Sequence, residues 1–338
     1  MIYHDPLYGP IDISEPSLID LMHTAAMQRL RGVLQHGITG LLGITRATTR
    51  FEHSVGVMLL VRRLGGSLAE QIAALLHDVS HTAFSHVIDY VFDGHDRQSY
   101  HEEMKEPYMA ASDVPAALAR HGYDWRDFLH EDDFPLLEQP APALCADRLD
   151  YFLRDSRDLG LTSDDEVQSA LKHLIVHAGR IAVDDLAAAR WIGYTYIAAD
   201  EKSWANFREV GLYELAARAI KTGLRLGVIQ EADLWDTDDR LWSNLHASND
   251  SDLQSQLRLI SPDTQFVWDE TAPTFCVSTK LRTVDPDVVI EGRAQPLSSI
   301  DAEFGHARLE YISSKQGKWP MRVISHPYPP TPFASPDI

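Results

Sequence analysis

Three His-Asp dipeptides are the features of this sequence that most directly suggest metal chemistry: His4-Asp5, His77-Asp78 and His95-Asp96. The first stands before a proline near the N-terminus, and the third lies in a predicted loop. Only His77-Asp78 follows a continuous apolar run, residues 72–76, that is typical of a buried helix. An ionised aspartate at the end of such a helix is costly unless it is paired or binds a metal, and the adjacent imidazole adds a nitrogen ligand. His77-Asp78 is therefore the candidate metal-binding pair.

Two further side chains can complete a metal site of this kind. His53 begins the predicted helix before the one that carries His77, and a short connection makes the two helices antiparallel neighbours. Asp147 lies on a later predicted helix, where it shares one face with Tyr151 and Asp155. Two histidines and two carboxylates accept Mn, Fe, Mg, Ni, Co or Zn without a sharp preference. We therefore expect a divalent metal ion as the cofactor of such a site.

Three ordered blocks of the sequence resemble the HD superfamily of metal-dependent phosphohydrolases, and within it the deoxynucleotide triphosphohydrolase branch. They are Arg50-Phe-Glu-His-Ser-Val-Gly-Val57, Leu75-Leu-His-Asp-Val-Ser-His-Thr-Ala-Phe-Ser-His86 and Asp147-Arg-Leu-Asp-Tyr-Phe-Leu-Arg-Asp155. The segment from Gln28 to Gln35 is similar to the family's lead-in, and His101-Glu102 resembles its downstream His-Glu pair. The resemblance covers about residues 17–160 clearly, and a weaker part of it extends to about residue 230. Each block is a weak signal alone, whereas the three in order are a strong one.

The resemblance implies a role for each matching position. The implied metal ligands are His53, His77, Asp78 and Asp147. The implied catalytic residues are His81, His101 and Asp155, and the implied substrate-binding residues are Arg50, Arg148, Tyr151 and Gln35. Elementary chemistry agrees with these roles. Phosphate-ester hydrolysis needs a Lewis acid that activates water, a histidine that can transfer a proton, and arginines that contact phosphate oxygens at two points.

Several of the same residues also have simple structural interpretations. Tyr151 is equally consistent with packing in the core, and Asp155 with an ion pair to Arg154 or Arg157. His81, four residues after His77, is also consistent with an orienting role behind the metal ligands.

The substrate is less well defined than the chemistry. Residues 36–46 lack the aromatic, base-facing element that is usual in the triphosphohydrolase branch. Residues 200–208 offer only Lys202 and Arg208 to a triphosphate. A deoxynucleoside triphosphate, another nucleotide, a monophosphate or a different phosphoester all fit the hydrolytic residues. We expect a small phosphorylated molecule of the nucleotide type.

Two other functions compete with this interpretation. One is a nucleotide-sensing HD module without turnover, and the retained His81 argues against it because a sensor needs no proton donor. The other is a two-metal HD phosphodiesterase or oxygenase, for which His81, His101, His121 and His130 supply enough histidines. The residues around His77 match the mononuclear branch more closely, and this favours one metal.

Hydrophobic periodicity predicts helices over residues 17–34, 51–64, 68–78, 82–92, 101–111, 143–159 and 186–226. Ser67 is the expected N-cap of the third helix. Runs typical of strands follow at residues 266–268, 274–279, 288–290, 307–312 and 321–324, before a proline-rich tail that we expect to be extended. The sequence thus predicts a mainly α fold, with an HD helical bundle over residues 1–240 and a smaller mixed α/β or β-rich region over residues 241–338.

Composition limits location and partners. The net charge of −20 and the pI near 5.1 argue against non-specific nucleic-acid binding, although a metal and local arginines can still attract a small anion. The apolar runs are too short to span a bilayer, and the N-terminus has no secretion signal. Two cysteines are too few for a disulfide framework, so we expect a cytoplasmic protein. The family resemblance adds the expectation of a homo-oligomer.

Overall fold

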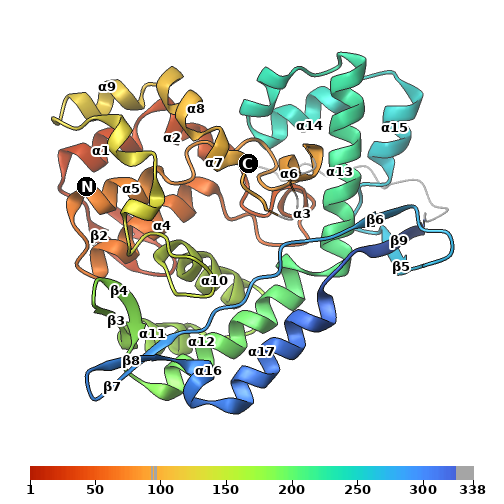
Figure 1. Cartoon of the computed structure of the whole chain (residues 1–338). Helices are drawn as coiled ribbons and strands as arrows, with labels where there is room; N and C mark the ends of the chain where they lie inside the picture. Colours follow the sequence, from red (N-terminus) through yellow and green to blue (C-terminus); the bar gives the residue numbers. More distant parts are fainter. Residues whose placement is uncertain (93, 95–96, 325–338) are drawn as a thin grey trace.

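The structure is a computed structural model that describes residues 1–92, 94 and 97–324. The dipeptide His95-Asp96 and the proline-rich tail lie outside the described residues. The α-helices are α1 (Pro16–Met22), α2 (Ala25–Arg29), α3 (Gly37–Leu41), α4 (Arg50–Arg63), α5 (Leu68–Leu76), α6 (Val87–Val91), α7 (Tyr100–Glu103), α8 (Lys105–Ala111), α9 (Val114–Ala119), α10 (Ala146–Asp158), α11 (Asp164–His173), α12 (Leu186–Ala199), α13 (Phe207–Leu226), α14 (Asp238–His246), α15 (Ser251–Arg258), α16 (Leu297–Ile300) and α17 (Ala302–Lys315). The strands are β1 (Ile2–Asp5), β2 (Gly9–Asp12), β3 (Leu174–His177), β4 (Arg180–Val183), β5 (Gln265–Trp268), β6 (Phe275–Val277), β7 (Asp287–Ile290), β8 (Arg293–Pro296) and β9 (Trp319–Ile324). The predicted mainly helical fold with small sheets is confirmed (Figure 1).

Helices α4, α5 and α10 form the framework of the N-terminal part. Helix α4 begins with a capping box between Thr49 and Glu52, and Ser67 caps α5 by accepting a hydrogen bond from the backbone N–H of Glu70. The apolar side chains of α5 are fully buried against α4, and α10 packs on the other side of α4. This packing brings the first turn of α4, the end of α5 and the first turn of α10 to one place.

Two predicted helices are interrupted in the structure. The helix predicted over residues 17–34 divides at Thr24, whose side chain caps α2 by accepting from the backbone N–H of Met27. The helix predicted over residues 82–92 begins only at Val87, because Phe84 and Ser85 have positive φ values of 61° and 49°. Apolar periodicity is retained across both interruptions, and it therefore did not reveal them.

The long helix predicted over residues 186–226 is also divided. Helix α12 ends in a π-helical turn, η4 (Asp200–Trp204), and α13 starts after Asn206, whose side chain accepts from two backbone N–H groups of α13. Single π-turns inside helices are frequent at functional sites. Here the turn carries Ser203 and Trp204 to the wall of the cavity described below.

The C-terminal part joins the N-terminal part through a sheet and a shared core. Strand β7 pairs in parallel with β4 in the order β3-β4-β7-β8, and a second sheet has the order β5-β9-β6. The second of two apolar clusters combines Phe84 and Val87 with Leu253, Phe275 and Met321. The region over residues 241–324 therefore packs directly on the helical part.

One predicted strand in the C-terminal part is wrong. Residues 307–312 lie inside helix α17, which Asp301 caps by accepting a hydrogen bond from the backbone N–H of Phe304. Phe304 and Tyr311, two helical turns apart, are buried on one side of α17, so the helical period satisfies the apolar residues better than a strand would.

The segment between β6 and β7 has no regular secondary structure and crosses the face of the molecule near α10 and α12 (Figure 1). We call residues 279–283 of this segment the strap. Among the described residues, no helix has both the length and the apolar character needed to cross a membrane.

Candidate functional site

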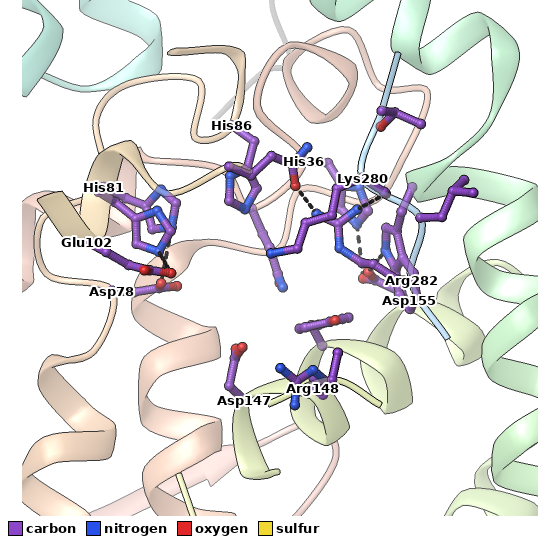
Figure 2. Close-up of a pocket in the computed structure, with 18 of the residues that line it drawn as sticks. His36, Asp78, His81, His86, Glu102, Asp147, Arg148, Asp155, Lys280 and Arg282 are labelled. Carbon is purple, nitrogen blue, oxygen red and sulfur yellow. Dashed lines mark hydrogen bonds and ion pairs between the residues drawn. The ribbon is translucent and has the colours of Figure 1, made fainter. Parts of the chain in front are cut away.

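Three helices bring together the four side chains that were expected to bind a metal. His53 Nε2 lies 2.9 Å from Asp147 Oδ1 and 3.3 Å from His77 Nε2. His77 Nε2 lies 3.5 Å from Asp147 Oδ1 and also 3.5 Å from Asp78 Oδ1. In Figure 2, Asp78 lies at the left of the central space and Asp147 points into it from below. The ligand atoms of His53, His77 and Asp147 thus lie within 4.8 Å of one another, and Asp78 stands beside this group, 3.5 Å from His77 Nε2.

The outer hydrogen bonds of the two histidines fix how their rings point. His53 Nδ1 lies 2.8 Å from Asp150 Oδ2, and His77 Nδ1 lies 2.8 Å from the carbonyl oxygen of Ala74. Because both partners are acceptors, each Nδ1 carries the proton and donates it. In the neutral form that binds a metal, the Nε2 lone pairs of the two rings are then directed at each other and at Asp147. A cation is the partner that such facing acceptors require, and an oriented imidazole backed by a carboxylate or carbonyl is typical of metal ligands.

The local charges agree with this interpretation. Burial lowers the pKa of His77, but the carboxylates of Asp78 and Asp147 outweigh it and raise this pKa to about 10. Burial raises the pKa of Asp147, but its hydrogen bonds with His53 and His77 outweigh this and hold the pKa well below its usual range. The carboxylates of Asp78 and Asp147 therefore stay ionised, and they stabilise positive charge on the buried groups next to them. These residues fit a divalent cation, which would take the place of the bound protons.

Arg50 lies behind Asp78. Its Nη1 donates to Asp78 Oδ2 at 2.6 Å, its Nε donates to Ser85 Oγ at 3.0 Å, and its Nη2 donates to the carbonyl oxygen of Gln35 at 3.4 Å. The guanidinium is buried and lowers the pKa of Asp78 against the effect of burial. Arg50, expected to bind substrate, thus already neutralises a carboxylate of the metal group.

Three histidines stack beside the metal group. The ring centroids of His81 and His101 are 3.9 Å apart with the rings nearly parallel, and His86 meets His81 edge-on at 5.1 Å. His81 Nε2 lies 3.1 Å from Asp78 Oδ1, although the angle does not make a hydrogen bond. Both ring nitrogens of His81 and Nδ1 of His101 are buried with no hydrogen-bond partner among the described residues.

The stacked histidines are neutral at physiological pH. Burial and the charge of Arg50 lower the pKa of His81 to about 3. Burial and the neighbouring His81 also lower the pKa of His101. Buried neutral imidazoles that face a cavity without a partner are able to donate an N–H or to accept a proton from a bound molecule. Asp78, His81 and His101 also form a second group whose ligand atoms lie within 4.8 Å of one another.

Asp155 lies away from the metal group, on the opposite wall of the cavity. His36 Nε2 is 3.0 Å from Asp155 Oδ1, and Trp204 Nε1 donates to Asp155 Oδ2 at 2.7 Å. Figure 2 shows His36 and Asp155 side by side, on the far side of the cavity from Asp78. Burial lowers the pKa of His36, and Asp155 more than offsets this and raises it. Asp155 thus orients His36 and Trp204.

The other expected substrate contacts line the same cavity. Arg148 Nη2 donates to Glu138 Oε1 at 2.6 Å, and Arg148 Nη1 donates to the carbonyl oxygen of Gln139 at 2.6 Å. The hydroxyl groups of Tyr151 and Tyr196 form a hydrogen bond with each other. Gln35 Oε1 is buried, and it has no partner among the described residues. The aromatic and amide groups therefore provide a polar wall between the metal group and Asp155.

The cavity has a volume of about 400 Å³. Some of the residues that line it were not predicted as site residues from the sequence. Lys280 and Arg282 enter it from the strap, and Figure 2 shows the Lys280 side chain reaching from there toward Asp147 and Arg148. No motif surrounds these two residues, and more than 120 residues separate them from Asp147 in the sequence. Asp150 was missed for a different reason: it lies inside a recognised block but one helical turn from the assigned ligand.

The site has the parts of a hydrolase that works with a metal: a ligand group, neutral histidines and a polar cavity. Residues 50–155 match the HD domain family. The chain is 39% identical over 325 residues to the metal-dependent phosphohydrolase cns2 of Cordyceps militaris, with 93% of each protein covered. It is also 41% identical over 290 residues to the uncharacterized protein YdhJ of Bacillus subtilis, covering 86% of this chain and 89% of YdhJ. The chain belongs to the HD-domain metal-dependent phosphohydrolases.

Two further comparisons refine this assignment. The deoxynucleoside triphosphate triphosphohydrolase SAMHD1 of Danio rerio is 26% identical over 222 residues, which cover 51% of this chain and 36% of that protein. The similarity to the triphosphohydrolase branch is thus distant and partial. A crystal structure of a phosphohydrolase from Bacteroides thetaiotaomicron has the same fold, with a TM-score of 0.71, 18% identity, and 95% of this chain and 99% of that chain covered.

Proposed function

We propose that this protein hydrolyses a phosphoester or phosphoanhydride bond in a nucleotide-like small molecule, with one divalent cation held by His53, His77, Asp78 and Asp147. The observation that carries the proposal is the convergence of His53, His77 and Asp147, with Asp78 beside them, at a cavity. The wall of this cavity includes His77, Asp78 and Asp147 together with His81 and His101. A cavity of about 400 Å³ is within the size range of small-molecule sites.

Each group of side chains has a distinct task in this proposal. When bound, a divalent cation supplies a Lewis acid that lowers the pKa of a water molecule and offsets charge on phosphate oxygens. Asp150 and the carbonyl oxygen of Ala74 hold the two histidine rings, and Arg50 keeps Asp78 ionised and in place. His81 and His101 act as N–H donors or proton acceptors toward the phosphate or the leaving oxygen.

The opposite wall binds the rest of the substrate. Gln35, Tyr151 and Arg148 present polar atoms to the cavity, and Asp155 holds His36 against it. Hydrogen-bonding groups beside aromatic rings are suited to a sugar and a base. A deoxynucleoside triphosphate is one candidate because of the partial similarity to SAMHD1, and a nucleoside monophosphate is another.

The proposal is tested by turnover of a substrate panel. The panel contains a deoxynucleoside triphosphate, a ribonucleoside triphosphate, a nucleoside monophosphate and a cyclic dinucleotide, each with added Mn. We expect release of inorganic phosphate, pyrophosphate or triphosphate from at least one of the first three. A metal-loaded protein that releases none of these products contradicts the proposal.

One observation favours a second candidate, a two-metal phosphodiesterase. Asp78, His81 and His101 could hold another ion next to the first group. This alternative predicts two equivalents of metal per chain by elemental analysis and turnover of the cyclic dinucleotide. One equivalent supports the mononuclear proposal.

A further inference from the structure

The arginines that the helical part contributes to the cavity already have carboxylate partners. Arg50 is paired with Asp78 at 2.6 Å, and Arg148 is paired with Glu138 at 2.6 Å. An anionic substrate would have to share both cations with these carboxylates. The cavity wall also carries further acidic residues, namely Glu102, Glu131, Asp132, Asp155 and Glu209. Without other positive charge, this wall would repel a phosphate.

The strap supplies positive charge that is not compensated in this way. Lys280 is exposed to the open cavity, and its ammonium has no hydrogen bond or ion pair with any described residue. Arg282 is half-buried, and its guanidinium donates to two neutral oxygens, the side-chain Oε1 of Gln98 and the carbonyl oxygen of Lys280. Burial and the charge of Arg282 lower the pKa of Lys280, and the more distant carboxylates of Glu102 and Asp147 offset this only in part.

The strap is held in position by contacts outside the cavity. The backbone N–H of Arg282 donates to Asp200 Oδ2 at 3.0 Å, and Tyr311 donates its hydroxyl to the same oxygen at 2.9 Å. Arg308 Nε donates to Thr283 Oγ1 at 3.0 Å. The two cations therefore stand on a fixed backbone opposite the metal group, and ordering them at binding costs little beyond the Lys280 side chain.

We propose that Lys280 and Arg282 form an anion-binding subsite for the phosphate of the substrate, and that this subsite favours a terminal phosphate with two negative charges over a singly charged phosphodiester. The inference rests on the proposed function and narrows it to phosphomonoesters and to terminal phosphates of nucleotides. A dianion placed between the bound cation and the strap interacts with positive charge on both sides, and Coulomb attraction grows with its charge.

Calorimetric binding of inorganic phosphate to the Mn-loaded protein tests the subsite without requiring turnover. Dimethyl phosphate is the singly charged probe. We expect the wild type to bind inorganic phosphate more tightly, and Lys280→Gln to weaken this binding about 10- to 100-fold, the value of a hydrogen bond to a charged group. Binding of dimethyl phosphate should weaken less. Lys280→Arg keeps the charge and should retain most of the affinity.

Two controls separate the subsite from general effects. Lys318→Gln removes the same charge from an exposed position outside the cavity and should bind phosphate like the wild type. The Mn affinity of Lys280→Gln should not fall below that of the wild type, because Lys280 has no hydrogen bond with the metal group and its charge repels a cation there. Arg282→Gln is the second test of the subsite and should weaken phosphate binding in the same direction.

The inference is overturned if the wild type binds no phosphate, if it prefers dimethyl phosphate, or if Lys280→Gln binds phosphate as tightly as the wild type does. These outcomes differ from failure of the proposed function. If the protein turns over the panel but binds phosphate equally well with and without Lys280, the subsite alone is rejected. Phosphate binding that depends on Lys280, without turnover of any substrate, would reject the hydrolytic proposal alone.

Discussion

Asp150 sets the orientation of His53 and is itself held by a buried network. Arg154 donates to Asp150 Oδ2 at 2.8 Å and also pairs with Asp5 at 2.8 Å, while Tyr8 donates its hydroxyl to Asp150 Oδ1 at 2.9 Å. Asp150 and Arg154 lie against α4 at Gly56, where any Cβ would clash with both side chains. The metal group therefore depends on a residue that does not bind the metal.

Asp150→Asn should weaken metal binding while leaving all four ligands present. The amide is a poorer acceptor for His53 Nδ1–H, so the ring loses its fixed tautomer and position. Loss of such an outer partner typically reduces metal affinity about 10- to 100-fold. Titration of the metal-free protein with Mn measures this change. Asp158→Asn, on the same helix but paired with the exposed Arg46, is the matched control, and equal affinities of the two variants would contradict the role of Asp150.

His81→Ala should separate turnover from metal binding. A proton-transferring histidine typically contributes about 10²- to 10⁴-fold to the rate, so we expect a loss of kcat in this range with one equivalent of metal retained. Steady-state kinetics and elemental analysis on the same preparation measure both quantities. His121→Ala, which removes a histidine paired with Asp20 at the surface, should behave like the wild type. A drop from two equivalents of metal to one would instead favour the two-metal enzyme.

The residues of the metal group could be predicted because chemistry and sequence context both single them out. His77 and Asp78 follow a buried helix, and His53 and Asp147 stand in blocks that resemble a known family. The partners of these residues could not be predicted in the same way. Whether Asp155 faces a metal, a sugar or His36 depends on how η4 packs against α10. The spacing of residues in the sequence does not predict this packing.

At the scale of elements, the π-helical turn η4 connects the cavity wall to the strap. Asp200 in this turn is fully buried, and its Oδ2 accepts hydrogen bonds from both Arg282 and Tyr311. Its Oδ1 has no partner among the described residues and is therefore the oxygen that can carry a proton. Burial raises the pKa of Asp200 to about 6, against the opposing effect of the Arg282 charge.

This raised pKa predicts how stability changes with pH. The unfolded chain releases the proton of Asp200 near its ordinary pKa of 3.8, whereas the folded chain keeps it until about pH 6. The contribution of Asp200 to stability is thus fully present below about pH 4 and is lost as the pH rises through 6. Two pKa units correspond to about 3 kcal/mol.

Asp200→Asn should remove this part of the pH dependence. The carbonyl oxygen of the amide can still accept from Arg282 and Tyr311, but the side chain no longer titrates. Urea unfolding at pH 4, 5, 6 and 7 gives the free energy of unfolding of both proteins. The wild type should lose about 3 kcal/mol relative to the variant across this range. Parallel curves for the two proteins would show that Asp200 is ionised throughout.

Sequence periodicity predicted the elements that carry the site better than those around it. The predicted helices 51–64 and 68–78 correspond to α4 and α5 within two residues, because caps and buried faces agree there. The breaks at Thr24 and at Phe84–Ser85 arise from a side-chain cap and from left-handed backbone, and the strand predicted over residues 307–312 became a helix through packing of Phe304. Such tertiary effects outweigh a short apolar pattern.

At the scale of the whole molecule, one apolar core extends across residue 240, the predicted boundary between the helical region and the C-terminal region. Leu253, Phe275 and Met321 share an apolar cluster with Val87 and Ile220, and β7 extends the sheet of β3 and β4. Removing the C-terminal part would expose this cluster to water, at a cost of about 25 cal/mol for each Å² of apolar surface.

We therefore expect a fragment that ends at residue 240 to lose its fixed structure. Size-exclusion chromatography should show aggregation, and thermal melting followed by near-ultraviolet circular dichroism should show no cooperative transition. A chain that ends after residue 324 keeps every contact of the described residues and is the control. A monomeric 1–240 fragment that melts cooperatively and binds Mn would show that the helical part folds independently.

The position of the strap in the sequence determines the order in which the site is assembled during translation. The ribosome releases His53, His77 and Asp147 long before it releases Lys280 and Arg282. A nascent chain therefore contains every candidate metal ligand before the strap has been synthesised. A ribosome that stalls between these two points produces a polypeptide that has the metal ligands but lacks the lysine and the arginine proposed to select the substrate.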